Sequence, residues 1–396
     1  MLLRNAMKKS LCLLLCLLLC LSLPAMAEED PSALLVDDSL EYTSRIDDLS
    51  AGMTLHEKVC QLFFLAPEQF SNNGRINAPG KSFYKSFTRF PVGGVILFSP
   101  NIVKSKIKSL NAGMQEAAAG VNGIGLLIGA DEEGGSVSRV ANKLKLPEKQ
   151  PAPSLVVSED QAYRSADAIG GYLSEYGFNV DFAPVADVRS EIPGAAIARR
   201  CYSDDPETVA AMVTRFVDGL HDRGIIPVLK HFPGLGAVSG DTHTGTGISE
   251  KTPEDWRRVD FIPFSAGIRA SAEMVMVSHQ VAVRVDPDTP ASLSPSVIAF
   301  LREELGFEGV IITDALRMDA VKEKYGSGEA CVLALEAGAD MLLLPYNFTN
   351  AYHGVMEALE SGRLTEKRLD ESLRRILSLK EQYGLLTRKT EDPKYE

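Results

Sequence analysis

Two short segments carry residues whose types and spacing suit covalent catalysis. Asp241-Thr242-His243 lies in a glycine-rich stretch, and Asp314 directly follows the apolar run Ile311-Ile312-Thr313. In an extended loop, side chains two residues apart point the same way, so the Asp241 carboxylate could orient the His243 ring for proton transfer. The same three residues would also fit a solvated turn with no catalytic role. With Asp314 as a carboxylate nucleophile, the set could form and then break an ester to a sugar.

Other polar side chains follow apolar runs along the chain. A lone acid at the end of a strand usually caps a helix, but capping does not require Lys, Arg or His there. We therefore expect these strand ends to converge on one pocket, with Asp187 as a structural hydrogen-bonding residue. The remaining candidates for the pocket are Asp131, Arg139, Arg200, Lys230, His231 and His279.

The elements that must position these residues alternate between two kinds. Eight short apolar runs could each form a strand that is buried on both faces, and segments with helical periodicity lie between them. This alternation predicts an α/β fold, and eight units favour a single (β/α)8 TIM-type barrel over a doubly wound sheet. The expected strands are Val59–Leu65, Val92–Phe98, Gly125–Ala130, Val180–Val185, Ile225–Leu229, Met274–Ser278, Gly309–Thr313 and Ala339–Leu344.

The expected helices and two long loops complete this pattern. The loops Arg189–Asp205 and Gly234–Lys251 both follow expected strands, on the end of a barrel where active sites are built. The predicted helices include Ile107–Ala119, Ala162–Tyr176, Pro206–Arg223, Pro295–Leu305 and Glu366–Tyr383.

The N-terminus has the pattern of a cleaved secretory signal peptide. Basic residues (Arg4, Lys8 and Lys9) precede the apolar run Leu11–Leu23, and Ala25-Met26-Ala27 supplies small residues at a cleavage position. The run is shorter than a membrane-spanning helix requires. The chain is therefore divided into a signal peptide (1–27), a lead-in (28–54), a catalytic domain (55–388) and a charged tail (389–396). A lipid anchor on Cys20 is the alternative for the N-terminus.

Charge and cysteine content exclude several classes of function. The formal net charge of the whole chain is −12, and loss of the three basic residues of the signal peptide would make it −15. This acidity argues against nucleic-acid partners and against binding to an anionic membrane. Cys60, Cys201 and Cys331 remain after cleavage, with neither the spacing of metal ligands nor that of a disulfide framework. We expect no metal and no cofactor.

The ordered motifs of this chain resemble glycoside hydrolase family 3, and most of all its bacterial β-N-acetylglucosaminidase (beta-hexosaminidase) branch, which acts in peptidoglycan recycling. The resemblance runs from about Leu55 to Leu386. It rests on Asp131-x-Glu133-Gly134-Gly135-x-Val137-x-Arg139, Asp181-Phe182-Ala183-Pro184-Val185-x-Asp187-Val188, Lys230-His231-Phe232-Pro233-Gly234-x-Gly236, Asp241-x-His243, Glu304-Leu305-Gly306-Phe307-x-Gly309 and Thr313-Asp314-Ala315-Leu316-x-Met318.

The resemblance implies a role for each candidate residue. Asp314 would be the nucleophile, and His243, partnered by Asp241, would be the acid and then the base. His279 would contact the substrate or pack below the pocket. Ser136, which replaces a usual Arg, and Thr244–Gly247, which departs from the common loop ending, leave the leaving-group preference and the loop dynamics open. Leu235 in place of a frequent His is a further departure, and Thr242 in place of a usual Ser is a mild one. The residues expected to hold the N-acetylglucosamine unit are Asp131, Arg139, Arg200, Lys230 and His231.

The sequence thus predicts a secreted, monomeric, retaining exo-β-N-acetylglucosaminidase. Its partner would be a terminal β-linked N-acetylglucosamine in a peptidoglycan fragment or related glycan, with no stable membrane insertion. Two alternatives remain open at this point. One is a phosphorolytic variant, because a His acid/base tolerates an approaching phosphate anion better than a second carboxylate would. The other is a catalytically idle protein that binds cell-wall fragments.

Overall fold

The computed structural model describes residues 38–71, 74–78, 80–190, 197–238, 245 and 247–387. The chain divides into two compact units, residues 1–48 and 49–396. Helix α2 (Asp38–Gly52) contains the boundary between them. The expected signal peptide (1–27) and charged tail (389–396) lie outside the described residues, so both stay predictions.

The larger unit is built on a ring of eight parallel strands. Their order in the sheet is β11-β9-β7-β6-β3-β2-β1-β12, and a parallel bridge between Ile312 and Met341 joins the two ends of that order. The predicted (β/α)8 barrel is therefore confirmed. The strands are β1 (Phe63–Leu65), β2 (Gly94–Ile96), β3 (Leu127–Ala130), β6 (Val180–Asp181), β7 (Ile226–Phe232), β9 (Met274–Val277), β11 (Val310–Thr313) and β12 (Leu342–Leu343).

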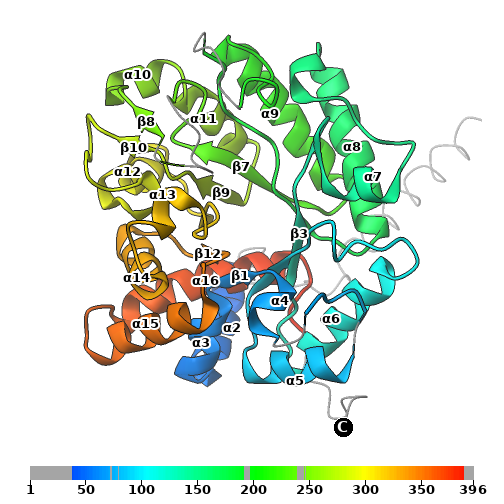
Figure 1. Ribbon diagram of the computed structural model, residues 1–396, viewed down its shortest axis with the longest axis vertical. Helices are drawn as coiled ribbons and strands as arrows, with labels where there is room; N and C mark the ends of the chain where they lie inside the picture. The colour runs from blue at the N-terminus through cyan, green and yellow to red at the C-terminus, as the bar shows by residue number, and fades with distance from the viewer. Residues whose placement is uncertain are drawn as a thin grey trace, which may run out of the picture. The chain divides into compact units, whose positions relative to one another are not determined.

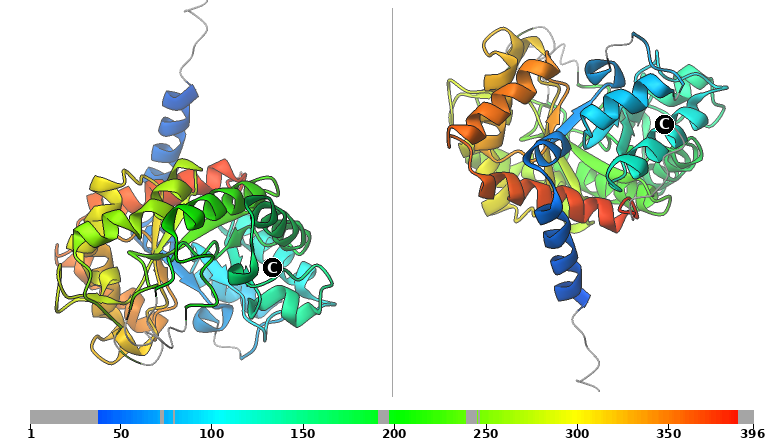
Figure 2. Two further views of the ribbon diagram at one scale, coloured as in Figure 1. Left: turned by 90° about the horizontal axis from the view of Figure 1, so that it is seen from above. Right: turned by 90° about the horizontal axis from the view of Figure 1, so that it is seen from below.

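Helices lie around this ring of strands (Figure 1). Neighbours in the chain pack side by side, as α8 with α9 and α14 with α15 do in Figures 1 and 2. Among the described residues, no helix is both long and apolar enough to cross a membrane. The helices of this unit include α3 (Leu55–Gln61), α4 (Pro67–Phe70), α5 (Lys81–Arg89), α6 (Ile107–Val121), α7 (Arg139–Leu144), α8 (Glu159–Glu175), α9 (Pro206–His221), α10 (Pro253–Arg258), α11 (Phe261–Arg269), α12 (Pro295–Ala299), α13 (Asp319–Lys322), α14 (Ser327–Ala337), α15 (Phe348–Glu360) and α16 (Glu366–Gln382).

The first predicted strand begins too early. Val59 and Cys60 belong to α3, and only Phe63–Leu65 of that apolar run is a strand. The helix starts because Thr54 and Glu57 form a capping box, in which each side chain accepts from the other residue's backbone N–H. The apolar run then passes from a buried helix end straight into a buried strand, which an apolar pattern alone does not separate.

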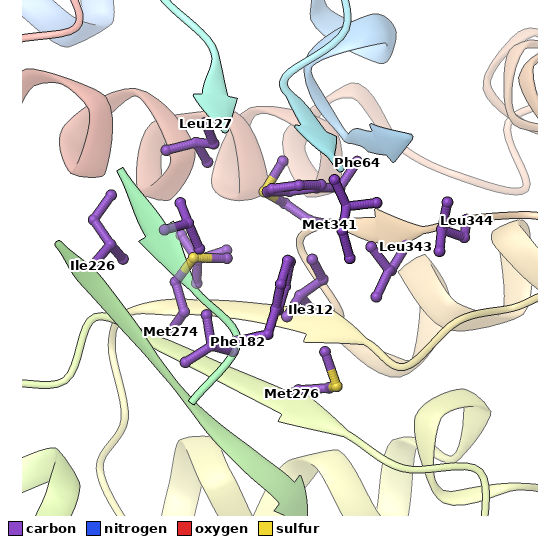
Figure 3. Close-up of a cluster of buried hydrophobic side chains, with 14 of the residues drawn as sticks. Phe64, Leu127, Phe182, Ile226, Met274, Met276, Ile312, Met341, Leu343 and Leu344 are labelled. Carbon is purple, nitrogen blue, oxygen red and sulfur yellow. The ribbon is translucent and has the colours of Figure 1, made fainter. Parts of the chain in front are cut away.

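Side chains from different strands fill the inside of the barrel. Phe64 on β1 and Phe182, which follows β6, meet edge to face with their ring centroids 5.3 Å apart (Figure 3). Gly129 on β3 leaves room for this pair, because a Cβ there would lie 2.8 Å from the Phe182 ring. The barrel is therefore a packed core with no channel through this layer. Cys60, Cys201 and Cys331 are buried free thiols.

Candidate active site

A cavity of about 500 Å³ opens at the carboxyl ends of the strands. In a parallel barrel this is the end at which side chains from several strands meet. The residues that reach it lie on or follow strands of the barrel, among them β2, β3, β6, β7, β11 and β12. Six of the residues singled out from the sequence line this one cavity: Asp131, Arg139, Arg200, Lys230, His231 and Asp314.

Lys230 lies at the centre of a buried cluster of charges. Its ammonium Nζ is 3.0 Å from Asp131 Oδ1 and 2.7 Å from Glu133 Oε1, and only 2% of the side chain is exposed. The Arg200 guanidinium donates to both carboxylate oxygens of Glu133, at 2.8 and 2.7 Å. Such bidentate, charge-assisted bonds fix orientation as well as position.

The opposite charges of this cluster keep one another ionised although they are buried. Burial by itself would raise the pKa of Glu133, but Lys230 and Arg200 outweigh it and lower that pKa to about 2. Burial by itself would lower the pKa of Lys230, and the carboxylates of Glu133 and Asp131 raise it instead. The cavity therefore holds fixed, ionised groups at neutral pH, suited to orient the hydroxyls of a sugar.

An irregular stretch near the end of β7 presents two consecutive side chains to the cavity. Adjacent residues of a regular strand point to opposite faces, yet Lys230 and His231 both line the cavity. The pairing of β7 with β9 shifts register between Leu229 and Phe232, which is a bulge or similar irregularity. Irregularities of this kind commonly re-aim side chains beside active sites.

A chain of hydrogen bonds holds the His231 ring in one orientation. Asp187 Oδ2 lies 2.7 Å from His231 Nδ1, and Arg200 Nη2 lies 3.1 Å from His231 Nε2. A guanidinium has only donors, so Nε2 must accept and Nδ1 must carry the proton donated to Asp187. Asp187 also accepts from the backbone N–H of Leu235 at 2.6 Å. Asp187 is thus the structural residue that was expected, and the His231 ring has no nitrogen left for proton transfer.

The segment after β3 is shaped by a tight turn and a buried carboxylate. Gly134 has a φ of 95°, and a Cβ there would lie 2.1 Å from the carbonyl oxygen of Pro151, so only glycine fits. Glu132 accepts from the backbone N–H groups of Val140 and Ala141 at the start of α7. Burial raises the pKa of Glu132 to about 7 against these hydrogen bonds.

Arg139 is the first residue of α7, so the Glu132 cap also fixes its place. Its Nε lies 3.9 Å from Asp131 Oδ2, and the backbone N–H of Arg139 donates to the Asp131 carbonyl at 3.0 Å. Glu132 and Glu133 are neighbours on one short strand and therefore face opposite ways. One supports the helix, and the other enters the cavity.

Asp314 follows β11 at the cavity wall. Its Oδ1 accepts from the backbone N–H of Ala315 at 2.7 Å, which restrains the carboxylate against its own turn. His279 is not among the described residues that line the cavity, so of its two expected positions the structure favours packing below the pocket over contact with the substrate. It is fully buried, with Nδ1 2.7 Å from Ser292 Oγ and Nε2 3.0 Å from the carbonyl oxygen of Ala315. His279, two residues beyond the end of β9, therefore supports the turn that carries Asp314 through its contact with the Ala315 carbonyl.

Two charged residues of the cavity were not among those expected from the sequence. Glu133 was seen only as part of a motif, although it joins Lys230 to Arg200. Arg317, which also lines the cavity, was not noticed at all. A carboxylate directly before a glycine pair was the available signal for Glu133. The predicted acid/base residue His243 and its partner Asp241 lie outside the described residues.

The sequence matches the model of the glycosyl hydrolase family 3 N terminal domain over residues 54–379. A beta-hexosaminidase from Stenotrophomonas maltophilia is 35% identical over 274 residues, which cover 67% of this chain and 80% of that protein. Beta-hexosaminidase LpqI from Mycobacterium tuberculosis is 31% identical over 304 residues, covering 74% of this chain and 76% of LpqI.

Solved structures agree with these sequence matches. A glycoside hydrolase family 3 beta-N-acetylglucosaminidase from Paenibacillus superposes with a TM-score of 0.76 at 34% identity over 84% of this chain. This chain spans 63% of the length of that Paenibacillus protein. The M. tuberculosis LpqI structure gives a TM-score of 0.74 at 28% identity, covering 85% of this chain and 96% of LpqI. The fold, the family model and these relatives agree, and the chain belongs to glycosyl hydrolase family 3.

Proposed function

We propose that this protein is a retaining exo-β-N-acetylglucosaminidase that releases terminal β-linked N-acetylglucosamine from peptidoglycan fragments or related glycans. One observation carries the proposal. Asp314 lines the same cavity as the ionised cluster of Asp131, Glu133, Lys230 and Arg200. A carboxylate beside a preformed set of charged groups is what covalent hydrolysis of a polar ring needs. The names of the family relatives supply the identity of the sugar.

In the first step, the Asp314 carboxylate attacks the anomeric carbon of the terminal sugar. The bond from that carbon to the leaving oxygen breaks, and His243 gives its proton to this oxygen. A covalent ester between the sugar and Asp314 results, and the leaving alcohol departs. The Ala315 N–H holds Asp314 for this attack, and His279 acts through Ala315 as a positioning residue.

In the second step, water replaces the leaving alcohol. His243, now neutral, takes a proton from water as the water attacks the anomeric carbon, and the ester to Asp314 breaks. Two displacements at one carbon restore its original configuration, so the product has retained stereochemistry. The roles of His243 and Asp241 rest on the sequence motif, and that of Asp314 rests on motif and position together.

The test is release of aryl alcohol from an aryl β-N-acetylglucosaminide by the mature chain. Asp314→Asn is expected to lose about 10³-fold or more in kcat, because an amide cannot form the ester. His243→Ala is expected to lose activity and to regain part of it with azide, a small anion that can replace the water activated by the base. Circular dichroism confirms that each variant is folded.

Other outcomes would point to the alternatives. Acceleration by inorganic phosphate, with a sugar phosphate as the product, would favour phosphorolysis. Binding of N-acetylglucosamine without turnover of this glycoside or of the matching β-glucoside would favour a catalytically idle binding protein. Active Asp314→Asn protein would remove Asp314 from the mechanism.

We also propose that residues 1–27 are a cleaved signal peptide, that 28–54 lead into a catalytic domain over 55–388, and that the mature protein acts outside the cytoplasm as a monomer. The basic residues followed by an apolar run and small residues support this proposal. N-terminal sequencing of the exported protein should begin near Glu28, and light scattering should give the mass of one chain. An uncut N-terminus or a lipid on Cys20 would contradict it.

A further inference from the structure

One of the four cations that line the cavity is bonded differently from the others. Lys230 and Arg200 both contact Glu133, and Arg139 approaches Asp131. Within the described part of the chain, Arg317 has no carboxylate within ion-pair distance. Its guanidinium instead lies over the Phe98 ring, 5.1 Å from the centroid.

Arg317 also lies on a different part of the barrel mouth. Of the paired cations, Arg139 and Arg200 follow β3 and β6 and Lys230 lies on β7, whereas Arg317 follows β11 and Phe98 follows β2. In the order of the strands, β12 and β1 separate β11 from β2. The loops that follow β11 and β2 therefore meet at the contact between Arg317 and Phe98, and this contact restrains the Arg317 side chain.

Exposure shows which part of a substrate Arg317 would meet. Lys230 is almost entirely buried, and Arg200 is mostly buried, so these groups face the sugar that enters the cavity. Arg317 is exposed although it lines the same cavity. A side chain at the rim contacts the part of the substrate that projects from the cavity. In an exo-acting glycosidase that part is the leaving group.

The guanidinium group of Arg317 indicates which kind of ligand it would bind. A guanidinium presents parallel N–H donors that match the two oxygens of a carboxylate. The net charge of the chain, −12, disfavours the approach of an anionic leaving group. Arg317, which has no carboxylate partner among the described residues and is held on an aromatic ring at the rim, offsets this repulsion locally.

We propose that Arg317, held over Phe98, is a specificity-determining residue that binds a carboxylate on the leaving group of the glycoside. This inference rests on the proposed glycosidase function. It assigns the preference for the leaving group to the turn after β11, three residues beyond Asp314. The cluster around Lys230 then determines the sugar that is released, and Arg317 determines what the sugar is released from.

Two matched substrates test this assignment: an aryl β-N-acetylglucosaminide with a carboxylate on the aryl ring, and its methyl ester. The measured quantity is the ratio of their kcat/KM values, carboxylate over ester. Arg317→Met is expected to lower this ratio about tenfold, as loss of a charge-assisted bond would do. Arg317→Lys should give an intermediate ratio, because lysine keeps the charge but not the fork of donors.

Salt and a second arginine provide the controls. Raising the ionic strength from about 0.01 to about 0.5 M should lower the ratio for the parent and not for Arg317→Met, because salt screens exposed charges. Arg164→Met removes an exposed arginine that pairs with Asp160 on α8, outside the cavity, and should leave the ratio unchanged.

Two results would overturn the inference, and they are distinguishable. A parent that hydrolyses both substrates, with the same ratio in Arg317→Met, would overturn the role of Arg317 and leave the proposed function intact. A folded parent that hydrolyses neither substrate would overturn the proposed function and this inference with it.

Discussion

The two ends of the barrel strands each hold a buried carboxylate surrounded by cations. At the carboxyl end, Glu133 contacts Lys230 and Arg200. At the amino end, fully buried Asp340 lies 2.5 Å from Arg302 and 3.0 Å from Arg375, with Arg368 at 3.8 Å. The local electrostatics are alike, but the surroundings differ.

The groups around Asp340 are all used within the protein. Asp340 accepts from the backbone N–H of Ile311 and from Ser372, and Arg302 donates to the carbonyls of Phe307 and Gly309. Asp340 and its arginines thus tie helices to the start of β11. At the other end, Lys230 and Arg200 line an open cavity. A carboxylate surrounded by cations is therefore structural where the cations bond only to the protein, and available for function where they also face an open cavity.

Two buried lysines differ in the same way, in the direction of their pKa shifts. Lys230 lies between two carboxylates, which raise its pKa against burial. Lys380 on α16 is equally buried, and its Nζ lies 2.7 Å from the side-chain amide oxygen of Gln61. Burial lowers the pKa of Lys380 to about 7. Lys230 is therefore ionised across the physiological range, whereas Lys380 titrates within it.

The largest expected effect is on stability, at the amino end. Asp340→Asn should lower the free energy of unfolding by about 3–5 kcal/mol, because it leaves three partly buried arginines without their buried counter-charge. The kcat/KM of the folded fraction should stay within about twofold, since Asp340 is remote from the cavity. Denaturant titration measures the first quantity. The matched variant Asp370→Asn, at a half-exposed carboxylate paired with Lys58, should lose less than about 1 kcal/mol.

Glu133→Gln should give the opposite pattern. We expect kcat/KM to fall about 100-fold, because Lys230 and Arg200 lose the charge that orients them toward the sugar. The loss of stability should be smaller than in Asp340→Asn, since Asp131 still lies 3.0 Å from Lys230. Steady-state kinetics and denaturant titration on the same preparation measure both. Full activity with a large loss of stability would show that the Glu133 cluster is structural, as the Asp340 cluster is, and would contradict the comparison.

A smaller effect should appear in the pH dependence of stability. Between pH 7 and the usual lysine pKa of about 10.4, the unfolded state binds a proton at Lys380 that the folded state lacks. The free energy of unfolding contributed by Lys380 should therefore rise with pH in this window, by up to about 1.4 kcal/mol per pH unit. Below pH 7 the full cost of the buried charge is present.

Lys380→Met should remove this slope, while Lys367→Met, at an exposed position of the same helix, should keep it. Denaturation curves at several pH values compare the three proteins. An unchanged slope in Lys380→Met would mean that Lys380 is charged in the folded state throughout, as Lys230 is.

Much of the fold could be predicted from the sequence because strands and helices each have a recognisable hydrophobic pattern. Continuous apolar runs located all eight strands, and periodic segments located helices such as α9 to within two residues. The error at Val59 and Cys60 arose where a buried helix leads directly into a buried strand. There the decisive signal was the Thr54–Glu57 capping box, not hydrophobicity.

The site was less predictable because it depends on contacts between distant segments. Strand-end position brought Asp131, Lys230 and Asp314 into one cavity. No local pattern predicted that Glu133 would contact both Lys230 and Arg200. None predicted that His279 would contact the carbonyl of Ala315, next to Asp314. Arg317 was missed because a cation in a turn is ordinary until its partner, Phe98, is known.

The most direct test of the account is to trap the covalent intermediate. A 5-fluoro-N-acetylglucosaminyl fluoride slows both chemical steps, because the added fluorine opposes positive charge on the ring, while fluoride is a good leaving group. Peptide mass spectrometry after brief reaction should find the sugar on Asp314. A sugar attached to a different side chain, or turnover of this reagent by Asp314→Asn at the parent rate, would contradict the account.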